Sequence, residues 1–510
     1  MRSLGVLVVA PARRPLLYGL VLAIGVLICA LPLYHAYATL QLEWGDVGTI
    51  YDMLRNVFER GSLYYYDRGL DYFNVHFCPF LFALAALVVP LDGLPAYLAA
   101  HVIALVLAGY ALLLLTRKVT ASLSTAVLVF FAFLANPHTV ATNLYPHYDV
   151  FMLMGLLFFY YFWTIGKLPA AVGFLLLALS VKEDAWFYAF WLIMGRATLE
   201  NVKVTALLLG LSVGYGVLVT GWLWGFLYPG RDDLFMLCYT QAESRSDLLI
   251  YFLTHPLATG AKLVTGPGLV FLSSFLFLPL LAPVRSLLAL PTLYLWVNST
   301  SPERNSLAFY YSVPSLALFG VALPYGLRNL ARGVEWGLTR WGHEAGRARV
   351  IARRTPTFAA AALLGAAIAG NVMLPQNLYS SPNLWTVYMD SARRGDGPNG
   401  HQEVGWDIIE HRLKPGTSVI ADFTLATYVR SRHRTYGFHR DWARLRDGTL
   451  RPDYVLYQLR ARQPVIGPRR MRAMHEWMLA NREYRLIYAR DNYFLFERVT
   501  GEESRSGATS

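Results

Sequence analysis

Three adjacent ionisable residues interrupt an otherwise apolar stretch of this chain. The stretch reads LPAAVGFLLLALSVKEDAWFYAFWLIMG, in which Lys182, Glu183 and Asp184 separate two runs suited to lipid. Carboxylates take up protons or bind metal ions, and an ammonium group holds an anion. A single charge at the centre of a bilayer costs about 2.5–3.5 kcal/mol on the insertion scale. The triplet is therefore expected either away from the bilayer centre or facing something that uses its charges.

Three further segments between apolar runs carry carboxylates, imidazoles and tyrosines. For any one of these residues, ordinary solvation is the simpler interpretation. If all four segments lie on one face of a membrane, their reactive side chains could converge there as a site. The side chains concerned are Asp46, Asp71 and His76 in the first segment, His138, His147 and Asp149 in the second, and Glu303, Arg304, Tyr310 and Tyr311 in the third.

The composition is that of a polytopic membrane protein. Of the 510 residues, 55% are hydrophobic and 15% are charged, too apolar for an ordinary soluble chain. Cys29, Cys78 and Cys238 lack the spacing of a disulfide framework or a zinc site. Apolar runs, several near the ~20 residues of a spanning helix, are Pro15–Leu33, Ala96–Leu115, Ala121–Ala135, Val150–Thr164, Leu168–Val181, Ala185–Met194, Val202–Leu223, Val264–Ala282, Ser286–Val297, Leu307–Leu323 and Thr357–Leu374.

The positions of Lys and Arg in the loops predict the orientation. Arg13 and Arg14 precede the first run, which lacks a signal-peptide layout, so the N-terminus is expected in the cytoplasm. The apolar core of His76–Pro90 is short enough for an interfacial or re-entrant helix. If it does not cross, the basic loops all fall inside, which predicts eleven spans and an external C-terminus. The basic residues concerned are Arg117, Lys118, Lys167, Arg196, Lys203, Arg285, Arg328, Arg332, Arg340, Arg347, Arg349, Arg353 and Arg354.

This topology puts the charged triplet at the outer end of the helix that begins at Leu168. Lys182 to Asp184 would form a polar hinge before the next helix, which begins at Ala185. A snorkelling turn whose charges neutralise one another remains the alternative. In the first external loop, residues 41–95, apolar residues from Val47 to Phe58 recur at helical spacing and predict an amphipathic helix on the membrane surface that ends at Gly61.

Beyond residue 374 the chain changes character. Residues 375–510 hold no apolar run of spanning length, and short strand-like pieces alternate with helical ones after a linker, Asn377–Val404. Met471, Met474, Trp477 and Met478 lie on one face of a predicted helix. We expect a membrane domain, 1–374, and a small extracytoplasmic α/β domain, 375–510. Predicted strands are TSVIADF, RTYGF, PDYVLYQL, YRLIYA and YFLFERV, and predicted helices are LATYVRSR and RRMRAMHEWMLANR.

Several stretches together resemble a known family. They are GDVGTIYDMLRNVFERG followed by NVHFCPF, the PHYD loop, VKED, the segment from LPLLAPVRSLLALPTL to YYSVP, and PGTSVIADFTLATYVRSRHRTYGF with PDYVLY. The chain resembles the bacterial and archaeal membrane proteins of domain-of-unknown-function family 2079, which in turn resemble glycosyltransferases of the C superfamily, GT-C. The resemblance covers nearly the full chain.

The resemblance implies a multi-pass inner-membrane enzyme that takes a sugar from a polyprenyl phosphate carrier. The sugar would pass, with inversion, to a glycan, lipid or protein acceptor on the external face. Asp46 matches the acidic residue that typically serves as catalytic base or metal ligand. Lys182 and Arg304 are candidates to hold the leaving phosphate. The remaining substrate-binding candidates are His76, His147, Asp149, Glu183, Asp184, Tyr310 and Tyr311.

Metal dependence and two other functions stay open at this point. A bound Mg2+ or Mn2+ would recruit Asp46 with Glu183, Asp184, His76 or His147, since these ions prefer oxygen-rich sites. A transporter or lipid-handling protein is an alternative, although the two halves show no convincing repeat. The Arg-rich tail could instead bind an anionic envelope partner, or be ordinary surface charge. Membrane lipids are expected partners, and nucleic acid is not.

Overall fold

The computed structural model describes residues 14–40, 42, 46–65, 70–91, 93–197, 201–229, 236–307, 309–373, 400–430, 433–459 and 468–499. Contacts within the chain divide it into two compact units. The first unit comprises Met1–Leu33, Phe73–Leu81 and Ala99–Thr386. The second comprises Tyr34–Tyr72, Phe82–Leu98 and Val387–Ser510. The expected boundary after residue 374 and the external location of the C-terminal part stay predictions.

Apolar helices dominate the described part of the chain. Three of them, Pro15–Ala38, Leu94–Thr120 and Val202–Leu227, are long and apolar enough to cross a membrane. Two bent pairs of helices raise this number to five if each pair is one span. The bends are 52° between Leu123–Leu134 and Pro137–Leu144, and 83° between Arg245–Thr254 and Pro256–Ser273. The total of eleven spans stays a prediction.

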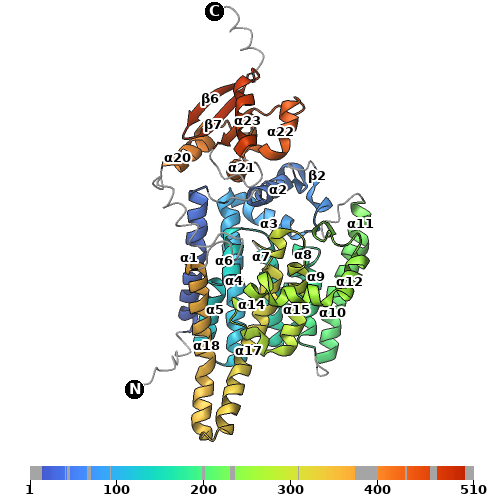
Figure 1. Ribbon diagram of the computed structural model, residues 1–510, viewed down its shortest axis with the longest axis vertical. Helices are drawn as coiled ribbons and strands as arrows, with labels where there is room; N and C mark the ends of the chain where they lie inside the picture. The colour runs from blue at the N-terminus through green and yellow to red at the C-terminus, as the bar shows by residue number, and fades with distance from the viewer. Residues whose placement is uncertain are drawn as a thin grey trace, which may run out of the picture. The chain divides into compact units, whose positions relative to one another are not determined.

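Most helices of the first unit, shown in Figure 1, match predicted apolar runs, but the run Val264–Ala282 is broken after Ser273, α17 extends well past the predicted end at Leu323, and α18 begins well before the predicted start at Thr357. α7 is buried on nearly all sides, as an evenly apolar helix should be. It packs tightly on α8, where a Cβ added to Gly155 would lie 3.0 Å from the Cβ of Ala178. The elements are α1 (Arg14–Ala38), α4 (Leu94–Thr120), α5 (Leu123–Leu134), α6 (Pro137–Leu144), α7 (Asp149–Thr164), α8 (Leu168–Val181), α9 (Ala185–Met194), α10 (Val202–Gly216), α11 (Trp224–Leu227), α12 (Arg245–Thr254), α13 (Pro256–Val264), α14 (Gly266–Ser273), α15 (Pro283–Val297), α16 (Pro302–Asn305), α17 (Val313–Arg340) and α18 (Ala345–Met373).

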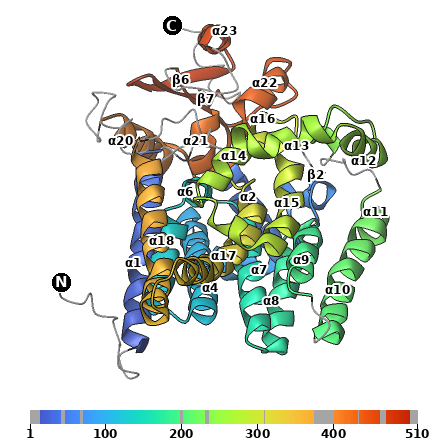
Figure 2. The same ribbon diagram turned by 60° about the horizontal axis from the view of Figure 1, so that its bottom comes forward.

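α17 and α18 form a long hairpin whose lower end in Figure 1 extends past the neighbouring helices. Figure 2 shows the same two helices side by side from below. In α17 every residue from Val313 to Leu327 is buried, whereas the residues from Arg328 onward are not. Gly342 permits the turn at the tip with a φ of 83°, a conformation that favours glycine.

The second unit contains a five-stranded mixed sheet of order β4-β3-β5-β7-β6. β4, β3 and β5 run parallel, whereas β7 pairs antiparallel with both β5 and β6. The structure confirms the predicted strands and the two predicted helices of this region, while most of the predicted linker lies outside the described residues. The elements are α20 (Gly400–Asp407), β3 (Ser418–Ala421), α21 (Phe423–Val429), β4 (Arg434–Gly437), α22 (Phe438–Arg446), β5 (Tyr454–Gln458), α23 (Pro468–Ala480), β6 (Tyr484–Arg490) and β7 (Tyr493–Arg498).

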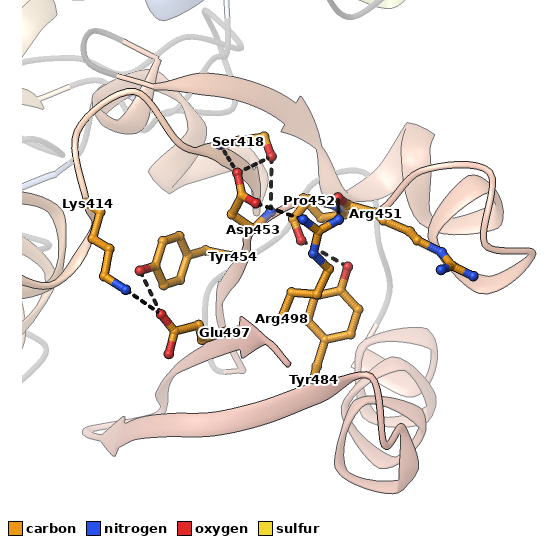
Figure 3. A network of polar contacts seen from close by, with 9 residues as sticks. All are labelled: Lys414, Ser418, Arg451, Pro452, Asp453, Tyr454, Tyr484, Glu497 and Arg498. Atoms are coloured by element: carbon orange, nitrogen blue, oxygen red, sulfur yellow. Dashed lines mark hydrogen bonds and ion pairs between the residues drawn. The ribbon is translucent and has the colours of Figure 1, made fainter. Parts of the chain in front are cut away.

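The core of the sheet contains the methionine face that the sequence predicts on α23. Met471, Met474 and Met478 are buried against Val455 and Phe496, and Trp477 packs at the edge of the same cluster. A polar network then joins the ends of the strands (Figure 3). In that network Asp453 accepts hydrogen bonds from the backbone and hydroxyl of Ser418 at 2.9 and 2.8 Å and pairs with Arg498 at 3.2 Å.

The segment that carries Asp46 belongs to this second unit and packs on protein. α2 (Asp46–Arg60) ends before Gly61, as predicted. However, Val47, Ile50, Tyr51 and Leu54 are buried, and α2 contacts α21 so closely that a Cβ on Gly48 would lie 2.5 Å from the Cα of Thr427. The expectation that this apolar face lies on the membrane surface is therefore wrong for most of the helix. β1 (Tyr64–Tyr65), β2 (Leu70–Asp71) and α3 (Phe80–Val88) follow.

The chain just before α2 is held by aromatic residues of the C-terminal region. The Tyr428 hydroxyl accepts a hydrogen bond from the Leu42 amide at 3.0 Å and donates to the Ala36 carbonyl at 3.3 Å. Trp406 donates to the Ala38 carbonyl at 3.1 Å. The rings of Tyr37, Trp406 and Tyr428 contact one another. The first loop is thus fixed at its start by residues nearly four hundred positions later in the chain.

Candidate functional site

The charged triplet forms the predicted hinge between two apolar helices. α8 ends at Val181 and α9 begins at Ala185, as expected from the sequence. Lys182 adopts an extended backbone (φ −158°, ψ 148°), which ends the helix and directs the three side chains away from its axis. The hinge therefore presents an ammonium group and two carboxylates within one short turn.

Lys182 is held by the PHYD loop. Its Nζ lies 3.2 Å from Oδ2 of Asp149, the first residue of α7, and Oδ1 of Asp149 lies 3.3 Å from Nδ1 of His147. Asp149 and His147 are buried, and the Lys182 side chain is 9% exposed. Burial acts to lower the pKa of Lys182, but the carboxylates of Asp149, Asp184 and Glu183 together outweigh it, so the pKa is raised. Lys182 is thus a permanent, nearly buried cation.

Glu183 is bonded to the segment between β2 and α3. Its Oε1 lies 2.8 Å from Nδ1 of His76, and its Oε2 accepts the backbone N–H of Phe77 at 3.2 Å. Burial acts to raise the pKa of Glu183, but His76 and Lys182 together outweigh it and the pKa is lowered. Trp224 of α11 also donates its indole N–H to the Phe73 carbonyl, so two elements anchor this segment. Glu183 therefore ties His76 and Phe77 to the hinge.

Asp184 differs from Glu183, whose two oxygens are both bonded. Its Oδ2 accepts a hydrogen bond from the Tyr188 hydroxyl at 2.7 Å, while Oδ1 is buried without a hydrogen-bond partner among the residues that the structure describes. Burial raises the pKa of Asp184, and Lys182 opposes the rise only in part. A carboxylate with an unused oxygen and a raised pKa is suited to accept a hydrogen bond or a proton from a ligand.

Aromatic rings complete this group of residues. The imidazole of His147 stacks face to face on Tyr310, with centroids 3.6 Å apart and planes 7° apart. The Tyr310 hydroxyl donates a hydrogen bond to the Tyr311 hydroxyl at 3.2 Å. The Arg304 guanidinium lies 5.2 Å from the centre of the Tyr311 ring. The PHYD loop, the charged triplet and the segment from Arg304 to Tyr311, which were expected on one face of the membrane, thus contact one another within the first unit.

These side chains line a cavity of about 450 Å³. His76, the triplet, Arg304, Tyr310 and Tyr311 were expected at a site from the sequence, whereas His147 and Asp149 lie behind Lys182. Tyr188 could have been anticipated because it lies four residues after Asp184 on a helix. The lining also includes an aromatic set and a second arginine that had no signal in the sequence: Trp186, Phe187, Trp224, Trp296 and Arg245.

The remaining candidates are not among the residues that line this cavity. Asp46 begins α2 in the second unit and is half-buried, and a carboxylate in the first turn of a helix is also favoured by the helix dipole. Asp71 is the last residue of β2. His138 is buried on α6 with its ring 5.0 Å from that of Phe271, away from the cavity lining. The side chain of Glu303 lies outside the described residues.

The described residues do not offer a formed metal site. Within the described ranges, no group of three or more His, Cys, Asp or Glu side chains could hold a metal ion. Both oxygens of Glu183 are already bonded, and those of Asp149 face Lys182 and His147. The set of Asp46, Glu183 and Asp184 for Mg2+ or Mn2+ stays a prediction.

Comparison with solved structures relates this arrangement of helices to a known fold. ArnT from Cupriavidus metallidurans in the apo state superposes with a TM-score of 0.51 at 15% sequence identity. The match covers 95% of this chain and 98% of that one. ArnT is a GT-C glycosyltransferase, and a likeness at this identity shows that the present chain has a GT-C-like fold.

Sequence comparison adds the family. No curated protein matches the chain. A family model described as "Predicted membrane protein (DUF2079)" matches residues 50–495, which include the hinge, the PHYD loop, the aromatic cavity and most of the C-terminal sheet. The chain therefore belongs to the DUF2079 family of membrane proteins.

Proposed function

We propose that this protein is a membrane glycosyltransferase that takes a sugar from a polyprenyl phosphate carrier and transfers it to an acceptor hydroxyl on the external face. The observation that carries the proposal is the cavity beside the hinge. A nearly buried ammonium group, a carboxylate with an unused oxygen and several aromatic rings border one space of about 450 Å³. Apolar walls with a few placed polar groups are typical of small-molecule sites.

The chemistry requires a cation for the leaving group. In an inverting transfer the bond between the anomeric carbon and the phosphate oxygen breaks while the acceptor oxygen attacks from the opposite face. The bonding electrons leave with the polyprenyl phosphate, and Lys182 would stabilise that charge with its ammonium donors. Asp149, by keeping Lys182 protonated and oriented, acts as a positioning residue. Arg304 is the second candidate to contact the phosphate.

The chemistry also requires a base for the acceptor proton. Asp46 is the proposed base, on the strength of its place in the first external loop. Asp184 is the second candidate, because its Oδ1 is unused and burial raises its pKa toward the range in which a carboxylate accepts a proton efficiently. The proton of the acceptor hydroxyl would pass to whichever carboxylate faces it. The Trp186, Trp224 and Trp296 rings would contact the sugar.

Sugar transfer by the purified protein in vesicles tests the proposal. The assay offers polyprenyl phosphate sugars and follows release of polyprenyl phosphate together with labelling of a lipid or glycan acceptor. Asp46→Asn is expected to abolish transfer while expression and folding stay near normal, and Lys182→Met to reduce transfer at least about 100-fold, as for loss of a charge that stabilises a developing anion. Lys262→Ala, at an exposed position of α13, is the matched control.

Three outcomes contradict parts of the proposal. Full activity of Asp46→Asn removes Asp46 as the base, and loss of activity in Asp184→Asn alone would transfer that role to Asp184. Binding of the lipid-linked sugar without any release of polyprenyl phosphate would favour the lipid-handling alternative. No binding of any lipid-linked sugar would leave the family fold with a different function.

A further inference from the structure

Three tryptophans border the cavity beside the hinge, and their surroundings differ. Trp224 on α11 is only 7% exposed, and its indole N–H is bonded to the Phe73 carbonyl. Trp296 on α15 is also only 7% exposed and contacts the ring of Tyr311. Trp186 on α9 is half-buried. Of the three rings, that of Trp186 therefore has the most surface left for a ligand.

Gly216 of α10 lies over one face of the Trp186 indole. A Cβ added at this glycine would be 2.5 Å from Cδ2 of Trp186 and 2.8 Å from both Cγ and Cε2. Cδ2 is a ring-fusion atom whose three bonds all lie in the plane of the indole, so another atom approaches it closely only from above or below that plane. The φ of Gly216 is −54°, an ordinary helical value. The small size of glycine, not its backbone freedom, is therefore what this close approach requires.

Two hydroxyl groups hold this contact in place. Ser212, one turn before Gly216, donates a hydrogen bond to the Trp186 carbonyl at 2.9 Å. Thr220, one turn after Gly216, donates to the Gly216 carbonyl at 2.6 Å and also borders the cavity. Thr220 lies in a π-helical segment, Val217–Leu223, and such segments are frequent at functional sites. The ring of Trp186 is therefore fixed against α10 and presents a rigid surface to the cavity.

We propose that Trp186 is the platform on which the sugar of the donor stacks, and that Gly216 is the positioning residue of this platform. The inference rests on the proposed function and concerns the sugar, not the polyprenyl phosphate. The C–H groups on one face of a pyranose carry slight positive charge, which favours the negative face of an indole ring. The ligand class is thus a pyranose with an uninterrupted C–H face.

The position of Trp186 in the chain agrees with this role. In a sugar phosphate a single oxygen joins the sugar ring to the phosphorus, so a platform for the sugar must lie close to the group that holds the phosphate. Trp186 lies in the first turn of α9, four residues after Lys182, the proposed phosphate contact, and both side chains border the cavity. A phosphate at Lys182 would therefore bring the sugar within reach of the Trp186 ring.

Equilibrium binding to the full-length protein in lipid nanodiscs tests the inference. The probes are undecaprenyl phosphate alone and undecaprenyl phosphate linked to glucose, mannose or galactose. The wild type is expected to bind at least one sugar-linked probe about 3- to 10-fold more tightly than the carrier alone, the range expected for one aromatic stacking contact. Gly216→Ala should lose most of this difference, because the added methyl group displaces the ring, while its affinity for undecaprenyl phosphate alone should not change. Gly214→Ala is the matched control, since it adds the same methyl group to α10 at a position with nothing within 4 Å, and it should keep the wild-type difference.

A double variant tests whether Gly216 acts through the ring. Trp186→Ala should abolish the preference for the sugar-linked probe, and Gly216→Ala/Trp186→Ala should bind no worse than Trp186→Ala alone, because a positioning residue has no effect once the ring is absent. The double variant also removes the steric conflict, so it can be measured even if Gly216→Ala alone is unstable.

The failure of this inference can be distinguished from the failure of the proposed function. A wild-type preference that persists in Gly216→Ala or in Trp186→Ala, or additive losses in the double variant, would overturn the platform while sugar transfer stands. An equal loss in Gly214→Ala would show a general effect of added methyl groups on α10 and would overturn it as well. If the wild type neither transfers a sugar nor prefers any sugar-linked probe over the carrier, the proposed function itself is wrong, and the inference fails with it.

Discussion

Lys182 Nζ lies 3.2 Å from Oδ2 of Asp149, and this pair joins the hinge after α8 to the first residue of α7. Both side chains are nearly buried. A buried ion pair often contributes little net stability compared with well-packed apolar residues, but removal of one partner leaves a buried charge without compensation. The contribution of this pair to stability and its role in function are therefore different, and mutations can separate them.

The first prediction concerns that separation. Asp149→Ala should lower the free energy of unfolding by about 3–5 kcal/mol, because it leaves the Lys182 ammonium buried and unpaired. Lys182→Met/Asp149→Leu should regain most of the lost stability, since apolar residues of similar volume replace both charges. Chemical denaturation in detergent gives the stabilities. If the double variant is stable yet still transfers sugar, Lys182 does not hold the leaving phosphate.

The second prediction uses the pKa of Asp184, which burial raises above the ordinary value of 3.8. A carboxyl whose pKa is higher in the folded state favours folding at low pH, and that contribution is lost as the pH rises through the folded pKa. Asp184→Asn, which can still accept the Tyr188 hydrogen bond, should therefore have a higher melting temperature than the wild type at neutral pH. The difference should shrink as the pH falls toward 3.8. If the difference in melting temperature is the same at every pH, the pKa of Asp184 is not raised in the folded state.

The sequence predicted where the elements lie better than it predicted how they meet. The breaks at Val181 and Ala185 followed from three charges between apolar runs, and the strands after residue 417 followed from alternation and turn residues. The pairing of Lys182 with Asp149, rather than with its neighbours Glu183 and Asp184, depends on how α7 packs on α8. No local pattern carries that information.

α2 illustrates the same limit. Its apolar spacing is compatible with a membrane surface or with a protein neighbour, and periodicity does not distinguish the two. In the structure this neighbour is α21, which approaches α2 closely at Gly48. The aromatic walls of the cavity were missed for a related reason, because Trp186, Trp224 and Trp296 each lie in or beside a helix where an aromatic residue is ordinary in a membrane protein.

The third prediction concerns the connection between the first loop and the C-terminal region. Tyr428→Phe removes an acceptor for the Leu42 amide and a donor to the Ala36 carbonyl, so the buried Leu42 amide loses a partner at a cost of about 1–3 kcal/mol. Hydrogen exchange should become faster around residues 36–50. Sugar transfer should fall as well, because Asp46 lies within the loosened segment.

A matched control is Tyr488→Phe, in the same unit, where the ring rather than the hydroxyl makes the contact, 4.0 Å from the Arg412 guanidinium. This variant should leave exchange in the first loop unchanged. Equal acceleration in both variants would indicate general loosening of the sheet rather than loss of a specific connection.

The last prediction concerns the metal. Because Glu183 is bonded to His76 and Phe77, and Lys182 already supplies a cation beside the cavity, transfer should continue in the presence of a chelator and should not rise when Mg2+ or Mn2+ is added. Glu183→Gln should then reduce transfer through loss of the His76 position, to the same degree with and without added metal. The decisive comparison is the response to metal in the wild type, in Glu183→Gln and in Asp184→Asn. A stimulation by Mn2+ that is present in the wild type and absent in both variants would show that the two carboxylates exchange their present partners for a metal ion when substrate binds.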